Sequence, residues 1–416
     1  TVYTYDAIGQ KIKGTVIGAD GQTRTASCTY DGAGNVLTET DTAGNVTSYQ
    51  YDGMSNITKI LYPDGSSESF AYDRAGNMTS QTDRTGLRTD YAYDLKRNVT
   101  AVTTAGEITG FEYYPNGKIY KITEPDGESL SHYYDNNWNC IKMADGVGNT
   151  VTYTYDAAGN RTSETDPLGN RTLYEYDSYD RCTQITDPMG NRTSYVYDAK
   201  GNTIRITDAM GNVTRMSYDA MDRLVKTEKV SEAGTISVSY AYDGAGRVTA
   251  VTDEEGRTSR ILYDGMGQEK AVMDAKGNII AENTYDGQGR LVKTADGMGN
   301  TTEYRYDIMG NITRLISCAD GEEKVETGYS YDAGGRLVSV ADGENGMVSC
   351  AYDGKGNMAS VTDPMGGTTA YTYDNMNRVT AVTNAIGARE SYTYNAQGLL
   401  AESRNAADEK TAYDHG

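Results

Sequence analysis

The sequence contains few of the residues that build an ordinary hydrophobic core. Its 416 residues include two Phe and one Trp, whereas Tyr occurs 36 times and Gly 47 times. Globular cores draw mainly on Leu, Ile, Val and Phe, and a buried Tyr needs a partner for its hydroxyl. The shortage argues against a thick core and favours a thin sheet that keeps both faces close to water.

The chain also lacks an excess of positive charge and any long apolar run. Its formal net charge of −21 argues against nucleic acid and anionic membranes as partners, because both bind surfaces rich in Lys and Arg. No apolar stretch approaches the length of a membrane span, and no signal peptide opens the sequence. Since Thr1 lies inside a repeat, we expect the sequence to be an excerpt of a longer protein.

Cysteine and histidine, which supply many nucleophiles and metal ligands, are scarce. There are five Cys, with no Cys-x-x-Cys pair, and two His. Cys140 and Cys182 share a repeat column but would lie four strands apart in a hairpin ribbon, about 19 Å. That separation is beyond disulfide reach, so we expect free thiols. His132 stands where the first Tyr of a Tyr-x-Tyr segment is usual and His415 lies in the tail, and neither has the companions of a catalytic triad.

The abundant feature is a repeat headed by Tyr-Asp. Tyr155, Tyr176 and Tyr197 are 21 residues apart, and most successive repeat tyrosines have this spacing. Self-similarity at a fixed period is the signature of a repeat architecture. We expect about 20 hairpin repeats in a single array over residues 1–416, with no separate catalytic domain. The tyrosines expected to hold the array together are Tyr51, Tyr72, Tyr93, Tyr155, Tyr176, Tyr197, Tyr306, Tyr352 and Tyr373.

Each repeat carries two turn signatures of the form Asp-x-x-Gly-Asn. An Asp at the first position caps a type I turn, and the Gly supplies the positive φ of a G1 bulge that closes a hairpin. Two turns in each period therefore predict two short strands in each period. The turn residues that we expect to be structural are Asp156, Gly159, Asp166, Gly169, Asp187, Gly190 and Gly356.

The strands between the turns follow a pattern that places the tyrosines on one face. Tyr-x-Tyr segments such as Tyr91-Ala92-Tyr93 direct two rings to the same side of a sheet. The return strand has apolar residues six and nine places after the repeat Tyr, as at Val99 and Val102. Six and nine differ in parity, so both face inward only if a bulge or strong twist intervenes. We predict an all-β fold in which tandem hairpins of about 21 residues form one long, spiralling antiparallel sheet.

The repeat resembles the YD/RHS repeat family. Residues 155–177 follow the family pattern Tyr-Asp-x-x-Gly-Asn/Arg-x-Thr-x-x-Thr-Asp-x-x-Gly-Asn-x-Thr-x-Tyr-x-Tyr-Asp nearly position for position, and versions of it cover most of the chain. The family includes bacterial Rhs and wall-associated proteins, shell components of insecticidal toxin complexes, and teneurins. The resemblance implies a β-sheet spiral that wraps into a hollow shell or solenoid and is secreted or displayed at the cell surface.

Two functions follow from the resemblance. In the first, the sheet is a structural wall that encloses or presents a toxin or effector cargo, supplied by adjoining domains of the same polypeptide. In the second, it is an extracellular surface for adhesion or carbohydrate binding. Asp-Pro-x-Gly elements at Asp166, Asp187 and Asp363 fall in the ordinary second-turn register, so the self-cleavage known in the family is not carried over.

Chemical alternatives to a structural role have weaker support in the sequence. Carboxylate pairs recur identically in every repeat, so no unique acid–base pair is expected. The repeated Asp residues could collect calcium, but the chain lacks the dense Asp-x-Asp-x-Asp ligand run. Asn-x-Thr triplets, as at Asn160, arise from the turn rule and give little support for glycosylation. We predict no enzyme activity and no catalytic, cofactor-binding or metal-binding residues.

Overall fold

The computed structural model describes residues 1–319, 324–344, 346–395 and 398–413. Over these ranges the chain forms 39 β-strands and no helix, and strands that follow one another along the chain pair in antiparallel fashion, as β1–β2, β15–β16 and β35–β36 do. The predicted all-β fold is therefore confirmed. Nowhere in these ranges is there a helix long and apolar enough to cross a membrane.

The chain divides into two compact units. Unit 1 comprises residues 1–128, 264–268 and 283–416, and unit 2 comprises residues 129–263 and 269–282. The last strand of unit 2, β27 (Ile279–Tyr285), has residues in both. The other strands of unit 2 are β13 (Ser129–Tyr134), β14 (Cys140–Asp145), β15 (Thr150–Tyr155), β16 (Arg161–Thr165), β17 (Arg171–Tyr176), β18 (Cys182–Thr186), β19 (Arg192–Tyr197), β20 (Thr203–Thr207), β21 (Val213–Tyr218), β22 (Leu224–Ser231), β23 (Gly234–Tyr242), β24 (Val248–Thr252), β25 (Thr258–Tyr263) and β26 (Glu269–Met273).

Unit 1 contains the strands from both ends of the sequence. The strands from its N-terminal part are β1 (Val2–Tyr5), β2 (Lys11–Ile17), β3 (Thr23–Tyr30), β4 (Val36–Thr40), β5 (Val46–Tyr51), β6 (Ile57–Leu61), β7 (Ser67–Tyr72), β8 (Met78–Thr82), β9 (Arg88–Tyr93), β10 (Val99–Thr104), β11 (Glu107–Tyr113) and β12 (Ile119–Thr123). Those from its C-terminal part are β28 (Leu291–Asp296), β29 (Thr301–Tyr306), β30 (Ile312–Cys318), β31 (Val325–Tyr331), β32 (Leu337–Asp342), β33 (Met347–Tyr352), β34 (Met358–Thr362), β35 (Thr368–Tyr373), β36 (Val379–Thr383), β37 (Arg389–Tyr394), β38 (Leu400–Arg404) and β39 (Lys410–Ala412).

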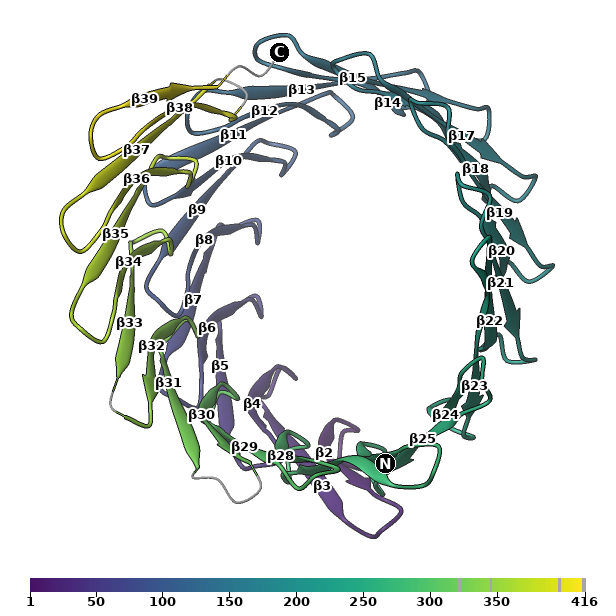
Figure 1. Ribbon diagram of the computed structural model, residues 1–416. Helices are drawn as coiled ribbons and strands as arrows, with labels where there is room; N and C mark the ends of the chain where they lie inside the picture. Colours follow the sequence, from purple (N-terminus) through teal and green to yellow (C-terminus); the bar gives the residue numbers. More distant parts are fainter. Residues whose placement is uncertain (320–323, 345, 396–397, 414–416) are drawn as a thin grey trace. The chain divides into compact units, whose positions relative to one another are not determined.

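Unit 2 is a single layer of hairpins. Figure 1 shows β14 to β25 following one another in chain order, each strand beside the next. A single layer encloses few side chains, and in the described ranges the buried residues are Gly18, Ser80, Ser163, Ala271 and Ala381. With so little enclosed, stability in such an array comes mainly from contacts between neighbouring hairpins.

One repeat shows how the turn residues shape the strands. The first turn, after the repeat Tyr155, is closed by a hydrogen bond from Asp156 N to Asn160 O at 2.9 Å and another from Gly159 N to Asp156 O at 3.2 Å. The second turn repeats this pattern from Asp166 to Asn170. Two such turns in every period fold the sequence into consecutive hairpins, with first turns along one edge of the sheet and second turns along the other.

A β-bulge in each repeat explains the apolar residues of unlike parity. Val99 pairs with Tyr93, but the register shifts at the next residue, so that Val102 pairs with Tyr91. The bulge adds one residue to the return strand. Both valines consequently lie on the same face as the two tyrosine rings. Equivalent shifts occur in the hairpins that contain Tyr242, Tyr331 and Tyr373.

Within unit 1, strands from the two ends of the sequence lie side by side, as Figure 1 shows for β28–β36 and the first strands. They meet at their turns and not at their faces. Ala19 N donates to Gly265 O at 2.8 Å, Gln288 donates to Asp41 at 2.9 Å, and Lys355 pairs with Glu107 at 3.2 Å. We call this contact between the second turns of residues 18–128 and the first turns of residues 264–378 the seam.

Candidate functional site

The repeat tyrosines form a hydrogen-bonded ladder along the sheet. The Tyr155 hydroxyl donates to the backbone oxygen of Cys140 at 2.8 Å, 15 residues earlier on the neighbouring strand. This bond satisfies the hydroxyl that the single layer half-buries and ties each repeat to the one before it. The same bond, at 2.6–2.9 Å, is made by Tyr51, Tyr93, Tyr176, Tyr197, Tyr306, Tyr352 and Tyr373.

Burial raises the pKa of several ladder tyrosines. Tyr72, the ninth tyrosine expected in the ladder, is half-buried in the same column, and burial raises its pKa. The effect is largest at Tyr49, whose hydroxyl donates to Glu39 at 2.8 Å. Burial, and then this hydrogen bond, raise the pKa of Tyr49 to about 12. An unshifted tyrosine hydroxyl, with a pKa of about 10, is already a donor at physiological pH, and the shifts act in the same direction.

The turn aspartates act as caps. One carboxylate oxygen of Asp156 accepts hydrogen bonds from Ala158 N and Asn160 N, both at 2.9 Å, and the other accepts from the Asn160 side chain at 3.1 Å. These bonds favour the charged form and lower the pKa of Asp156. Asp166 and Asp187 make the same three contacts with their own turns.

The glycines of these turns adopt backbone angles that other residues rarely adopt. Gly159 has φ +94°, a value outside the region where a side chain is tolerated without strain. A Cβ there would meet almost nothing, with Asn139 Oδ1 at 4.0 Å as the nearest atom. Backbone conformation, and not space, therefore requires this glycine. The other turn glycines expected to be structural also have positive φ, namely Gly169, Gly190 and Gly356.

A second kind of first turn ends in Arg in place of Asn, and sequence reasoning missed the further contact that this Arg makes. Arg336 pairs with its turn Asp332 at 2.7 Å and also stacks over the Tyr352 ring of the next repeat, 4.6 Å from the centroid. The alternation of Asn and Arg at one repeat position was the available signal. The same stacking, at 4.5–4.9 Å, is made by Arg181, Arg223, Arg247, Arg290 and Arg378.

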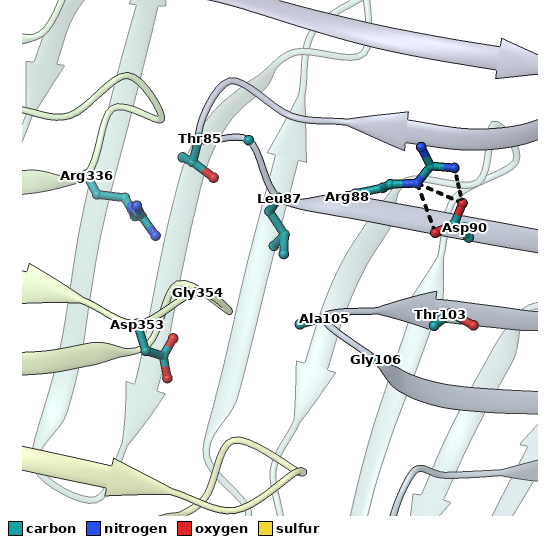
Figure 2. A pocket seen from close by; sticks show the side chains of 11 residues that line it. Thr85, Leu87, Arg88, Asp90, Thr103, Ala105, Gly106, Arg336, Asp353 and Gly354 are labelled. Atoms are coloured by element: carbon teal, nitrogen blue, oxygen red, sulfur yellow. Dashed lines mark hydrogen bonds and ion pairs between the residues drawn. The ribbon is translucent and has the colours of Figure 1, made fainter.

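Several cavities lie along the seam. One of about 420 Å³ lies between Thr85–Asp90 and Thr103–Gly106 on one side and Arg336, Asp353 and Gly354 on the other. Figure 2 shows these two groups facing one another, with Arg88 and Asp90 paired to each other. The Arg336 guanidinium is already held by Asp332. The charged groups are thus largely paired within the chain, and the cavity resembles a joint between edges more than a reaction site.

Groups with catalytic or metal-binding chemistry are dispersed. No cluster of three or more His, Cys, Asp or Glu suited to a metal occurs in the described ranges. His132 lies two residues before the repeat Tyr134, opposite Met143, and burial lowers its pKa. His415 lies outside the described residues. The five cysteines are free, half-buried thiols, which agrees with the expectation from their spacing.

The comparisons with known proteins place these features in a family. The sequence model of the family described as teneurin YD-shell matches residues 81–295 and 267–415, and that of the RHS repeat matches residues 30–67. The first model alone matches well over half of the chain. The chain belongs to the teneurin YD-shell family. No curated protein matches its sequence.

Solved structures share this YD-shell fold at low identity. A Tc holotoxin pore of Photorhabdus luminescens with a substitution in TccC3 is 13% identical, has a TM-score of 0.76, and covers 100% of this chain. TcdB2-TccC3 without its hypervariable C-terminal region is 15% identical, with a TM-score of 0.73 and 99% coverage. The chain covers only 28% and 26% of those chains, respectively. These likenesses therefore describe the fold.

Proposed function

We propose that the chain is part of the wall of a YD-repeat shell that encloses or presents a protein cargo. The observation that carries this proposal is the seam, where hydrogen bonds and ion pairs join turns 247 or 248 residues apart in unit 1. Edge-to-edge joining turns a ribbon of hairpins into a continuous surface, as a container requires. The tyrosine ladder supports the same role because it ties each repeat to the next.

The proposal extends to the organisation of the polypeptide. Residues 1–416 form one repeat array and belong to a longer, secreted or surface-exposed protein, whose adjoining domains supply the cargo. Solved TcdB2-TccC3 structures, one of them titled as a complex with Cdc42 at a TM-score of 0.71, support a fold compatible with a protein partner. The comparisons give no support to a carbohydrate partner, and no described feature favours the adhesion alternative.

We also propose that the array has no catalytic activity and needs no cofactor or metal. The uniformity of the repeats supports this, because catalysis requires unlike groups whose pKa values are set apart by distinct surroundings. Here Asp156, Asp166 and Asp187 have the same partners and the same direction of pKa shift.

Limited proteolysis of the complete polypeptide that carries this sequence tests the enclosing function. We expect any region outside the array that is enclosed to resist a protease under native conditions and to be cleaved after mild denaturation. The same region expressed alone serves as the control and is expected to be cleaved rapidly. Equal cleavage rates for the free region and the region within the native polypeptide would contradict the container role.

A further inference from the structure

The face of unit 2 opposite the tyrosine rings carries a group of exposed arginines. Val196 lies between Tyr195 and Tyr197 and therefore points away from the ring face, and Arg205 pairs directly with Val196. The same alternation places further arginines of β17, β19 and β21 on this side of the sheet. We define the basic face as Arg171, Arg192, Arg205 and Arg215, all of which are exposed.

Two of these arginines lie directly opposite each other. Arg205 and Arg215 are cross-strand partners in β20 and β21, an arrangement of like charges that destabilises a sheet. Glu228 lies opposite Arg215, but its carboxylate pairs with Lys226 at 2.7 Å. The ion pairs found within the described part of unit 2 include none of the four arginines of the basic face.

The other acidic group on this face is also engaged elsewhere. Glu175, on β17, accepts a hydrogen bond from the Gln184 side chain at 2.7 Å. The contacts of the basic arginines are with neutral hydroxyls instead. Arg171 donates to Ser163 at 3.2 Å and Arg205 donates to Thr207 at 3.3 Å. On this face the four arginines nevertheless outnumber the carboxylates of Glu175 and Glu228, so positive charge is in excess there.

Unit 1 shows how the chain neutralises an arginine pair when it does so internally. Arg305 and Arg314 are also cross-strand partners, in β29 and β30. There Glu326 pairs with Arg314 at 3.0 Å, and Glu303 lies 3.7 Å from Arg305. Both arginine pairs are direct cross-strand partners, although one pair flanks a first turn and the other a second turn. Only the pair in unit 1 has a carboxylate within ion-pair distance of each arginine.

We propose that the basic face of unit 2 binds an acidic segment of a polypeptide. The inference rests on the proposed function and deepens it, because the acidic segment would belong to the protein that the wall encloses or presents. Its carboxylates would supply the charges that Glu303 and Glu326 supply in unit 1. Four strand spacings separate β17 from β21, about 19 Å, which an extended segment of about six residues spans.

The surroundings of the basic face favour a short acidic segment over a long polyanion. First-turn aspartates such as Asp177 and Asp198 line one edge of the sheet, and second-turn aspartates such as Asp187 and Asp208 line the other, all with lowered pKa values. A nucleic acid or sulfated polysaccharide carries its charges past the face and over these edges, where like charges repel. The net charge of −21 adds to that repulsion.

Fluorescence anisotropy with a labelled alternating Glu-Asp peptide of about 12 residues, long enough to cross the face when extended, tests this proposal on the whole chain. We expect saturable binding that weakens as salt screens the charges. The double variant R205S/R215S should bind at least about tenfold more weakly. The matched variant R305S/R314S, at the internally neutralised pair, should stay within about twofold of the unaltered chain.

Each alternative outcome contradicts the proposal in a recognisable way. Equal losses in the two double variants would mean that binding is unspecific, and no binding by the unaltered chain would remove the site. Tighter binding of heparin or single-stranded DNA than of the peptide, lost in R205S/R215S, would replace the polypeptide by another polyanion. Misfolding does not explain a loss, because removing a like-charge pair should leave the melting temperature unchanged or raise it.

The proteolysis experiment separates this proposal from the proposed function. If the complete polypeptide carrying R205S/R215S still protects its cargo but the peptide fails to bind the unaltered chain, the wall stands and the acidic partner is wrong. If the peptide binds as expected but no region is protected, the basic face is a real site on a surface that does not enclose.

Discussion

The first turns of the N-terminal repeats and those of the C-terminal repeats of unit 1 are built differently. Early turns end in Asn, as at Asn56 and Asn77, whose side chains donate to their own turn aspartates at 2.9 and 2.8 Å. Several late turns end in Arg, as at Arg336 and Arg378, which pair with the turn Asp and also stack on the next Tyr. Both residues close the turn, but they reach the next repeat differently. Arg stacks on the next Tyr, whereas an Asn does so, where it does, by a hydrogen bond to the next turn, as Asn202 does to Asp222 at 3.0 Å.

The late turns are also the ones that meet another edge. Arg378 reaches Asp126 across the seam at 3.6 Å, and Lys355 reaches Glu107. Arg turns occur in unit 2 as well, where Arg247 stacks on Tyr263 at 4.5 Å. The stacking therefore belongs to the turn that ends in Arg and does not depend on the seam. In unit 1 the same edge of the sheet also forms the seam. The contrast shows that a shared hairpin frame leaves the fifth turn residue open to variation.

Acidification acts at once on all the turns that begin with Asp, which are the majority, and should have the largest effect. The Asn160 contacts lower the pKa of Asp156, and the Arg181 side chain does the same for Asp177. A lowered native pKa contributes stability that is present above the unfolded value, about 3.9, and is lost as pH falls through the native value. We expect the melting temperature to be level near neutrality and to fall steeply below about pH 4.

Circular dichroism melts from pH 7 to pH 2 measure this effect. Turns that end in Arg and turns that end in Asn should unfold in one transition, because both depend on the carboxylates of the turn aspartates. A melting temperature that declines already between pH 7 and 5 would show that other groups control the stability of the array.

Removing a ladder ring should have the next largest effect, and a larger one in an Arg repeat. Tyr155→Ala deletes a half-buried ring and its hydrogen bond, which should lower the free energy of unfolding by about 3 kcal/mol. Tyr352→Ala also deletes the ring on which Arg336 stacks, a further loss of about 0.5–1 kcal/mol. Thr154→Ala, on the opposite face, should cost only tenths of a kcal/mol. Urea titrations compare the three variants, and equal effects would contradict the assignment of the faces.

Adding a side chain to a glycine at the seam should lower the free energy of unfolding by less than the loss of a ladder tyrosine does. It should lower it by more than the same substitution at a first turn outside the seam. A Cβ on Gly265 would lie 2.6 Å from Asp20 N across the seam, whereas one on Gly244, at the same turn position, would meet nothing within 4 Å. We expect Gly265→Ala to lower the free energy of unfolding by about 1–3 kcal/mol. Gly244→Ala should change it by less than about 0.5 kcal/mol. Matching values in urea titrations would mean that the two backbones do not touch in solution.

Exchanging the two turn types should have the smallest effects, with opposite signs. Arg247→Asn keeps the turn closed but removes the stacking on Tyr263, at a cost of about 0.5–1 kcal/mol. Asn77→Arg adds stacking on Tyr93 and should raise stability by a similar amount. Differential scanning calorimetry of both variants checks the signs. Destabilisation by both exchanges would show that each turn is adapted to its own residue by contacts other than stacking.

The repeat frame could be predicted from the sequence because its determinants are local. Backbone geometry within one hairpin accounts for the spacing of Tyr155 and Tyr176 and for the Asp-x-x-Gly turns. It also accounts for the unlike parity of Val99 and Val102, which required the bulge that is found. The seam could not be predicted, because it joins Glu107 to Lys355 across 248 residues through positions that vary among repeats. The stacking of Arg on Tyr was missed because Asn and Arg both satisfy the turn, so the sequence pattern alone does not distinguish their second role.

Carbodiimide cross-linking of the purified chain, followed by mass spectrometry, tests the central claim that turns about 247 residues apart join into a continuous wall within unit 1. The Lys355 ammonium and the Glu107 carboxylate lie 3.2 Å apart, so the two should form an intramolecular amide that disappears in Lys355→Gln. We predict this link in the monomeric fraction, at protein concentrations too low for contact between copies. Links confined to residues in the same or adjacent repeats would contradict the seam and, with it, the wall.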